Sequence, residues 1–291
     1  MQLKGLYTAL ITPFDDKGNI DEEGFRDNIE YQIKNGVDGI VPVGTTGESA
    51  TLSEEEHKRV VNIAVEQVNG RVSVIAGTGS NNTIEALKYT KHAESVGADA
   101  ALMITPYYNK PTQEGLMKHY SKIASEVSIP IVLYTVPGRT GINIEPETTE
   151  RLSKIENIVA IKDASGNLDQ VMKVIRNCKN FTVLSGEDYL TYSIITLGGK
   201  GVISVASNVA PKMMSEFINA ALNGKWKKAK ELHYRLYPLF KILFIETNPS
   251  PVKAAMQMLG MPSGDPRLPL VRVKKESEEK IKYILREMGL L

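Results

Sequence analysis

Short apolar segments recur along the chain, and amphipathic segments separate them. The apolar segments have the length of β-strands and are rich in valine and isoleucine. Their apolar residues are nearly continuous rather than alternating, which is typical of parallel strands buried on both faces. The predicted strands occupy residues 6–11, 39–43, 72–76, 100–104, 131–134, 158–161, 182–184 and 201–205.

Polar residues at their starts and glycines at their ends mark the helices between these strands. Ser53 followed by Glu56 has the form of a capping box, in which each side chain bonds the backbone N–H of the other residue. Asn82 followed by Glu85 has the same form. Further helix caps are expected at Asp21, Asn167, Gly36, Gly70 and Gly97.

Eight consecutive strand–helix units predict the fold class. They favour an α/β protein with a closed (β/α)8 TIM barrel over an open doubly wound sheet, because right-handed crossovers close the ring at that count. We expect the barrel to span residues 1–224 and a small C-terminal helical appendage to span residues 225–291. Within the appendage, helices are predicted at 225–244, 250–259 and 274–288, with a loop at 260–269.

The composition excludes several classes of function. The 35 Lys and Arg residues nearly balance the 34 Asp and Glu residues, so no net field attracts nucleic acid or a membrane surface. A single cysteine, Cys178, and four histidines without metal-ligand spacing predict neither a disulfide framework nor a metal site. No apolar run is long enough to span a bilayer and no signal-peptide pattern stands at the start, so we expect a cytoplasmic protein.

Lys162 is the sharpest candidate for chemistry, since active sites of such barrels lie at the C-terminal ends of the strands. It directly follows the apolar residues 158–161. Burial there disfavours the charged ammonium, and a neutral amine is what a Schiff-base nucleophile requires. A lysine paired with Asp163 or a glutamate is the alternative, and position alone does not separate the two.

Three further polar groups follow predicted strands. The segment GTTGE at 44–48 lacks the lysine of a phosphate-binding loop, and suits either a turn that binds a small carboxylate or a plain tight turn. Tyr134 is a candidate for proton transfer, or else a core tyrosine. Arg139 on a Pro/Gly loop suits a substrate carboxylate, or else is simply solvated.

Four motifs together resemble the dihydrodipicolinate synthase and N-acetylneuraminate lyase superfamily. They are GTTGE at 44–48, YTVPGRTG at 134–141, IKDASG at 161–166 and GVIS at 201–204. The motifs occur in the family's order across nearly the whole chain. Members of this superfamily are pyruvate-dependent class I aldolases on (β/α)8 barrels.

The resemblance implies a lyase that condenses pyruvate with L-aspartate 4-semialdehyde, in the diaminopimelate route to lysine. Lys162 would form the Schiff base itself, so no cofactor is expected. Tyr108, in the family, comes from a neighbouring subunit and completes a proton relay. The catalytic residues implied are Lys162, Tyr134, Thr45 and Tyr108, and the substrate-binding residues are Thr46, Arg139, Gly186 and Ile203.

Two alternatives remain open from the sequence. One is another pyruvate aldolase, such as a 2-keto-3-deoxy sugar acid aldolase or an N-acetylneuraminate lyase-like enzyme. Arg139 favours the synthase, because sialic acid lyases lack this arginine and carry a serine–threonine pair in place of Thr45 and Thr46. The other alternative is a non-catalytic barrel that binds a 2-keto acid.

The resemblance also implies assembly and regulation. It suggests a homotetramer built as a dimer of dimers, with no nucleic-acid or membrane partner. Glu54 stands where lysine-sensitive members often have histidine, so the sequence leans against inhibition by lysine. The positions that match the family's lysine-binding site are Ser49, Ala50, His57, Asn81, Glu85 and Tyr107.

Overall fold

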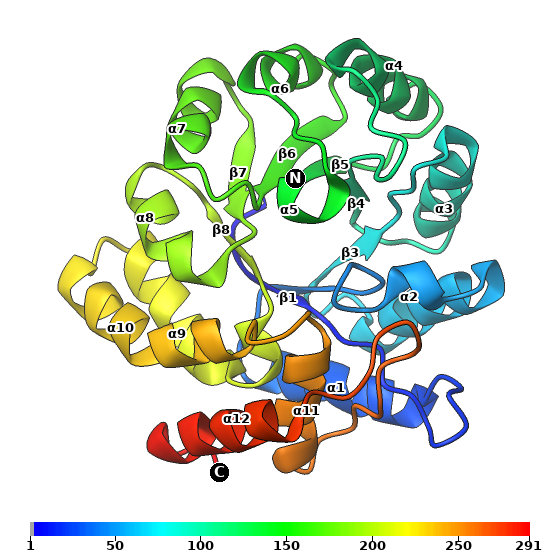
Figure 1. The fold of residues 1–291 in the computed structure, drawn as a ribbon. Coiled ribbons are helices and arrows are strands. Elements are labelled where there is room, and N and C mark those ends of the chain that lie inside the picture. Colours follow the sequence, from blue (N-terminus) through cyan, green and yellow to red (C-terminus); the bar gives the residue numbers. More distant parts are fainter. Residues whose placement is uncertain (1–2) are drawn as a thin grey trace. The chain divides into compact units, whose positions relative to one another are not determined.

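The computed structural model describes residues 3–291, and its sheet is a closed barrel of parallel strands in chain order (Figure 1). The (β/α)8 prediction is therefore confirmed. The strands are β1 (Gly5–Ala9), β2 (Gly39–Val41), β3 (Ser73–Gly77), β4 (Ala100–Ile104), β5 (Ile131–Thr135), β6 (Ile158–Asp163), β7 (Thr182–Ser185) and β8 (Gly201–Ser204).

Helices follow the strands and continue beyond the last of them. Those between strands are α1 (Glu22–Lys34), η1 (Ser49–Thr51), α2 (Glu54–Val68), α3 (Thr83–Ser95), α4 (Gln113–Ala124), α5 (Pro137–Thr140), α6 (Pro146–Leu152), α7 (Leu168–Asn177), η2 (Asp188–Leu190) and α8 (Thr191–Thr196). After β8 come η3 (Ala206–Asn208), α9 (Pro211–Leu222), α10 (Trp226–Ile242), α11 (Ser250–Met258) and α12 (Lys275–Glu287).

Strand ends differ slightly from the sequence prediction, and two strand ends matter for the site. β2 ends at Val41 rather than residue 43, because Val43 adopts a left-handed φ of 48° that a strand cannot contain. β6 extends to Asp163, two residues beyond its apolar run, as expected for a strand that ends in Lys162 and Asp163. Lys162 is therefore held inside the strand ladder rather than in the loop after it.

The predicted helix caps are mostly present. Ser53 and Glu56 form the full capping box at the start of α2. The second predicted box is wrong: Asn82 caps α3 through the N–H of Ile84, but Glu85 instead accepts a hydrogen bond from the hydroxyl of Ser80. Asp21 and Asn167 cap α1 and α7, and Gly36, Gly70 and Gly97 take left-handed conformations.

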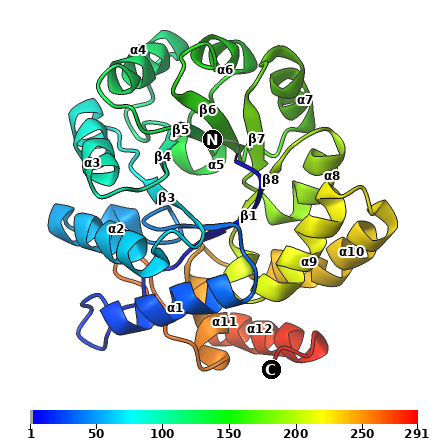
Figure 2. The ribbon, with the colours of Figure 1, turned by 180° about the vertical axis from the view of Figure 1, so that it is seen from behind.

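The chain divides into two compact units, and the first contains residues 75–203 with the described residues up to Gly5. In this unit α3, α4, α6 and α7 follow one another along the outer side of β4–β7 (Figure 1, and from behind in Figure 2). β4, β5, β6 and β7 pair in parallel, and their residues are almost all buried. The rigid ladder β5–β6 is the part that positions the site.

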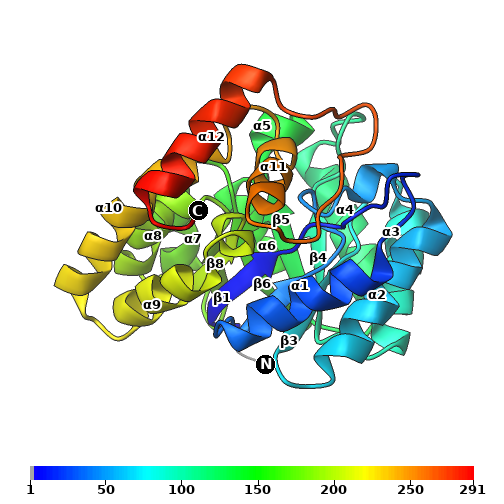
Figure 3. The same cartoon turned by 90° about the horizontal axis from the view of Figure 1, so that it is seen from below.

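The second unit contains residues 6–74 and 204–291. Here α1 packs on α2, α9 on α10, and α11 on α12 (Figure 3). The predicted appendage, residues 225–291, thus belongs to the same compact unit as the β2 loop. The domain boundary predicted at residue 224 stays a prediction.

No helix within residues 3–291 is both long and apolar enough to cross a membrane.

His119 is a buried histidine on α4 whose titration affects stability. Its Nδ1 lies 2.9 Å from the hydroxyl oxygen of Thr83, and its ring packs edge-to-face on Tyr120 at 4.9 Å between centroids. Burial lowers the pKa of His119 to about 4. The native protein therefore keeps this ring neutral at pH values where the unfolded chain protonates it.

We predict a loss of stability in mildly acidic solution that depends on His119. The folded-state pKa of His119, about 4, lies below the unfolded value of 6.5, so the contribution is complete above pH 6.5 and is lost as the pH falls toward 4. The full effect is roughly 3 kcal/mol. Urea unfolding of wild type and His119→Gln across this pH range should show a shallower decline for the variant. At about pH 8, the difference in unfolding free energy between the two proteins gives the packing cost of the substitution alone. Parallel curves of unfolding free energy against pH would contradict the assignment.

Candidate active site

Lys162 and Tyr134 lie side by side at the ends of two neighbouring strands. Tyr134 of β5 is paired in register with Lys162 of β6. The Nζ of Lys162 lies 4.2 Å from the centroid of the Tyr134 ring, and each residue is 6% exposed. The structure thus brings together the amine and the phenol that the sequence singled out.

Asp163 does not form an ion pair with Lys162. Successive residues of a strand point to opposite faces, so the two side chains of this sequential pair diverge. Asp163 Oδ1 accepts hydrogen bonds from the N–H and hydroxyl of Ser165, at 2.9 and 2.6 Å, and Oδ2 accepts one from Gln170 at 2.9 Å. The lysine–aspartate pair that the sequence allowed is not formed, which favours the nucleophile interpretation.

A polar circuit on the opposite face, buried except for the half-buried Asn143, fixes the ends of these two strands. Thr135 Oγ1 donates to Asn143 Oδ1 at 2.8 Å, and Asn143 Nδ2 donates to Gln170 Oε1 at 2.7 Å. Gln170 then donates to Asp163, which pairs in register with Thr135. Asn143 and Gln170 were not among the residues predicted from the sequence. The available signal was a glutamine on the inward face of α7, an amphipathic helix.

Gly186, directly after β7, allows the chain to approach the lysine strand closely. A Cβ atom at this position would lie 2.7 Å from the Cβ of Ala164 and 3.0 Å from the carbonyl oxygen of Asp163. Any larger residue would push apart the ends of β6 and β7. Ile203 is buried in β8 in the same unit, as expected of a residue that lines the barrel.

Arg139 lies on α5, a short helix that begins two residues after β5 ends. Its side chain is exposed. Thr140, next to it, is buried and donates a hydrogen bond to the carbonyl of Ile142 at 2.8 Å, which holds the loop closed. The arginine is thus presented from a fixed turn just beyond Tyr134.

The loop after β2, in the second unit, presents Thr45 and Thr46 on a tight turn. The N–H of Glu48 donates to the carbonyl of Thr45 at 3.1 Å, and Thr12 donates to the carbonyl of Gly47 at 2.7 Å. Thr45 is half-buried and Thr46 is buried. A tight turn is therefore present, and it also carries two hydroxyl groups in a fixed arrangement.

Residues far away in the sequence hold this loop. Asn248 Nδ2 donates to Thr46 Oγ1 at 3.0 Å. Glu48, with a left-handed φ of 56°, forms an ion pair with Lys253 at 2.5 Å, and both side chains are 1% exposed. Burial lowers the pKa of Lys253, and the carboxylate of Glu48 opposes that shift. Asn248 and Lys253 were not among the residues predicted from the sequence, because only the fold brings residues separated by about two hundred positions together.

Tyr108 and Tyr107 have different environments in the loop after β4. The side chain of Tyr108 is 89% exposed and its backbone has a left-handed φ of 70°. Tyr107 is half-buried, and burial together with the nearby Glu85 carboxylate raises its pKa. A large, exposed aromatic side chain on a constrained backbone is available to a second chain.

The positions matched to a lysine-binding site fall in both units. In the first unit, Tyr107, Asn81 and Glu85 gather around Ser80, the hydroxyl of which donates to Glu85. In the second unit, Ser49 and Ala50 form part of η1, and His57 is buried on α2. Their role in binding lysine stays a prediction.

Metal ligands do not cluster in the part of the chain that the structure describes. Among residues 3–291, no group of three or more His, Cys, Asp or Glu side chains is placed to hold a metal ion.

Comparison with known proteins identifies the family. The model of the Dihydrodipicolinate synthetase family matches residues 2–288. The 4-hydroxy-tetrahydrodipicolinate synthase of Methanococcus maripaludis is 55% identical over 99% of this chain and 100% of its own, and that of Methanocaldococcus jannaschii is 55% identical over 99% of both.

Solved structures agree with this assignment. A crystal structure of dihydrodipicolinate synthase at 55% identity superposes with a TM-score of 0.98, covering 99% of this chain and 100% of that one. The enzyme from Aquifex aeolicus, 49% identical, gives 0.97 with 99% of each chain covered. The resemblance and the lyase class predicted from four motifs are confirmed. The chain belongs to the dihydrodipicolinate synthetase family.

Proposed function

We propose that this protein is a 4-hydroxy-tetrahydrodipicolinate synthase. It condenses pyruvate with L-aspartate 4-semialdehyde in the diaminopimelate route to lysine. The observation that carries the proposal is the buried amine of Lys162, which lies over the ring of Tyr134 at the ends of paired strands. The proposal also rests on the full-length similarity to enzymes of that name.

The first half of the reaction takes place on Lys162. Its neutral amine attacks the ketone carbon of pyruvate, a carbon–nitrogen bond forms, and water leaves to give an iminium ion. The iminium withdraws electrons from the neighbouring methyl group. Loss of a methyl proton then gives an enamine, which is the carbon nucleophile. Because the lysine supplies the electron sink, this chemistry requires no cofactor.

The second half forms the ring and releases the enzyme. The enamine carbon attacks the aldehyde carbon of the semialdehyde, and the aldehyde oxygen takes up a proton. The substrate's amino group then attacks the regenerated iminium carbon and displaces Lys162. One water is released per turnover, and the lysine returns as a free amine.

Each proton transfer requires a positioned acid or base. We assign this role to Tyr134, Thr45 and Tyr108, with Tyr108 supplied by a neighbouring subunit. The 89% exposure of the Tyr108 side chain supports that exchange, because a relay group within its own subunit would not be left in solvent. Assembly would then be part of catalysis, in a homotetramer built as a dimer of dimers. The proposed biosynthetic role places the enzyme in the cytoplasm.

Carboxylate recognition is divided between two residues. Thr46, with the N–H groups of its turn, would bind the pyruvate carboxylate. Arg139 would bind the semialdehyde carboxylate, for which its planar fork of N–H donors is suited. Its exposed position just beyond β5 supports a role in admitting the second substrate. Gly186 and Ile203 would line the pocket around the lysine.

We predict that pyruvate and borohydride label Lys162 alone. Reduction should convert the imine to a stable secondary amine, seen as a mass increase that peptide mapping assigns to this residue. Lys162→Ala should fold, give no adduct and lose nearly all activity. Borohydride without pyruvate is the control. Labelling at another lysine, or none with folded protein, contradicts the mechanism and leaves the non-catalytic keto-acid binder as the alternative.

We predict that Tyr134→Phe lowers kcat by roughly 10²–10⁴, the usual contribution of a positioned acid–base group. The variant keeps the ring below Lys162 and removes only the hydroxyl. Tyr120→Phe is the matched control: this buried tyrosine on α4 makes one long hydrogen bond, 3.4 Å, to the carbonyl of Met103. Its kcat should remain near the wild-type value. Equal rates for both variants would remove Tyr134 from the relay.

We predict that Arg139→Ala lowers kcat/KM for aspartate semialdehyde by about 30-fold, the effect of losing a charged hydrogen bond of about 2 kcal/mol. Pyruvate trapping on Lys162 should persist. Arg151→Ala is the control, since Arg151 forms an exposed ion pair with Glu114 at 3.4 Å. Loss of trapping in Arg139→Ala would indicate a structural role. Unchanged use of the semialdehyde would favour a different aldehyde substrate.

A further inference from the structure

Asn248 contacts the proposed carboxylate-binding residue from the far end of the chain. It lies between α10 and α11, is 4% exposed, and donates from Nδ2 to Thr46 Oγ1 at 3.0 Å. The two residues are 202 positions apart. A buried amide held against a buried hydroxyl restricts the directions in which that hydroxyl can point.

The polarity of this hydrogen bond determines what else Thr46 can bind. A threonine hydroxyl has one hydrogen to donate and two lone pairs that accept. The amide of Asn248 occupies one lone pair, so the hydrogen stays available for a third group. A carboxylate oxygen can only accept, which makes it a matching ligand for that hydrogen.

We propose that Asn248 is a positioning residue for the pyruvate carboxylate: it keeps the Thr46 hydroxyl turned as a donor toward the substrate. The inference rests on the proposed function, in which Thr46 binds that carboxylate. Asn248 itself touches Thr46 and acts through it. Without the amide, the hydroxyl is free to rotate and loses its preset direction.

Besides the hydrogen bond between them, a nearby buried ion pair keeps Asn248 and Thr46 in place. Glu48 follows Thr46 by two residues, Lys253 follows Asn248 by five, and the two form the buried ion pair at 2.5 Å. Glu48 Oε2 also accepts the backbone N–H of Arg267 at 2.8 Å. The turn and the C-terminal segment are therefore joined by three contacts, so the Asn248 amide has little freedom to move away.

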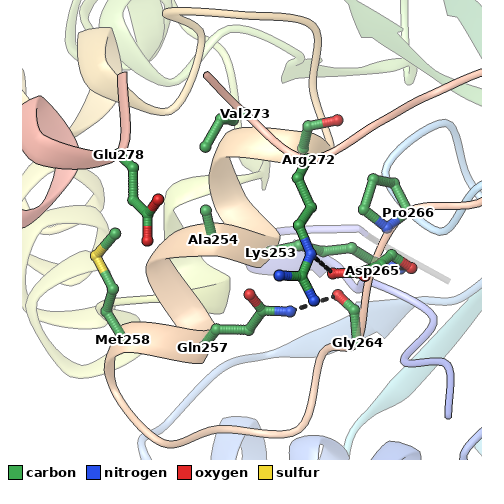
Figure 4. Close-up of a pocket in the computed structure, with 11 residues that line it drawn as sticks. Lys253, Ala254, Gln257, Met258, Gly264, Asp265, Pro266, Arg272, Val273 and Glu278 are labelled. Atoms are coloured by element: carbon green, nitrogen blue, oxygen red, sulfur yellow. Dashed lines mark hydrogen bonds and ion pairs between the residues drawn. The ribbon is translucent and has the colours of Figure 1, made fainter. Parts of the chain in front are cut away.

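The surroundings of Lys253 show which contacts hold this member of the ion pair (Figure 4). From α11 its side chain extends toward the loop that carries Asp265, and Nζ donates to the carbonyl of Asp265 at 3.3 Å. The same loop is held by the ion pair of Arg272 with Asp265 at 2.5 Å and by the hydrogen bond from Gln257 to the carbonyl of Gly264 at 3.0 Å. Asn248 thus reaches the loop from a segment that has several hydrogen bonds and ion pairs of its own.

The decisive variant is Asn248→Asp, which keeps the size of the side chain but replaces its N–H donors by acceptors. The Thr46 hydroxyl would then donate to the new carboxylate and present a lone pair to the substrate. We expect the KM for pyruvate to rise roughly 10- to 100-fold, the loss of one charge-assisted hydrogen bond. The KM for aspartate semialdehyde should stay within about twofold.

A double-mutant cycle separates positioning from a general structural effect. Asn248→Ala should raise the pyruvate KM several-fold in the wild-type background. In a Thr46→Val background, which has no hydroxyl to orient, the same change should add less than about twofold. Asn248→Ser, which retains a donor, should recover part of the loss. Asn223→Asp, on an exposed asparagine after α9 in the same unit, is the matched control and should behave as wild type.

The outcomes distinguish this inference from the proposed function. If wild type shows no pyruvate adduct on Lys162, the function is wrong. If wild type is labelled normally and folded Asn248→Asp keeps its pyruvate KM, the function stands and the positioning role is wrong. Should Asn248→Asp fail to fold, the Ala and Ser variants decide. The inference would be overturned if Asn248→Ala raised the pyruvate KM equally in the wild-type and Thr46→Val backgrounds. It would also be overturned if Asn248→Asp raised the KM of both substrates equally. Either result would indicate a purely structural asparagine.

Discussion

The register between β5 and β6 is the constraint on which the site depends. It places Tyr134 opposite Lys162 and, one residue further, Thr135 opposite Asp163. A shift of one residue would turn every side chain of β6 to the other face, burying the carboxylate where the amine now stands. The circuit of Thr135, Asn143, Gln170 and Asp163 opposes such a shift, because these polar groups, three of them buried, would lose their partners.

The two faces of the β5 and β6 ends therefore have different environments. The outward face satisfies every polar side chain in the circuit and sets the register. The inward face leaves an amine over an aromatic ring, with a close packing at Gly186 that only glycine permits. Polar groups that are fully bonded give rigidity, whereas the amine proposed here as the nucleophile has to retain a free lone pair. Because the hydrogen-bonded carboxylate of Asp163 and the amine of Lys162 lie on opposite sides of β6, the strand meets both requirements.

The sequence predicted the features that depend on local pattern. Continuous apolar runs gave the strands to within one or two residues, and the position of Lys162 after such a run, together with the motifs, pointed to its chemistry. It could not predict that Val43 ends β2 early, since valine seldom adopts a positive φ. Nor could it predict the contacts from Asn248 to Thr46 and from Lys253 to Glu48. Such contacts depend on how the C-terminal helices pack, and no local periodicity encodes them.

Two buried lysines, Lys162 and Lys253, have different surroundings and different proposed roles. Lys162 and Lys253 each lie over an aromatic ring, at 4.2 Å from Tyr134 and 4.1 Å from Phe14. Lys253 also has the Glu48 carboxylate at 2.5 Å, and removing its proton would leave that buried carboxylate without its counter-charge. For Lys162, the neighbouring carboxylate of Asp163 is turned away and fully hydrogen-bonded. A cation–π contact is a weaker interaction than a buried ion pair. The two buried lysines thus differ in their partners: Lys253 is paired with a carboxylate, and Lys162 is not.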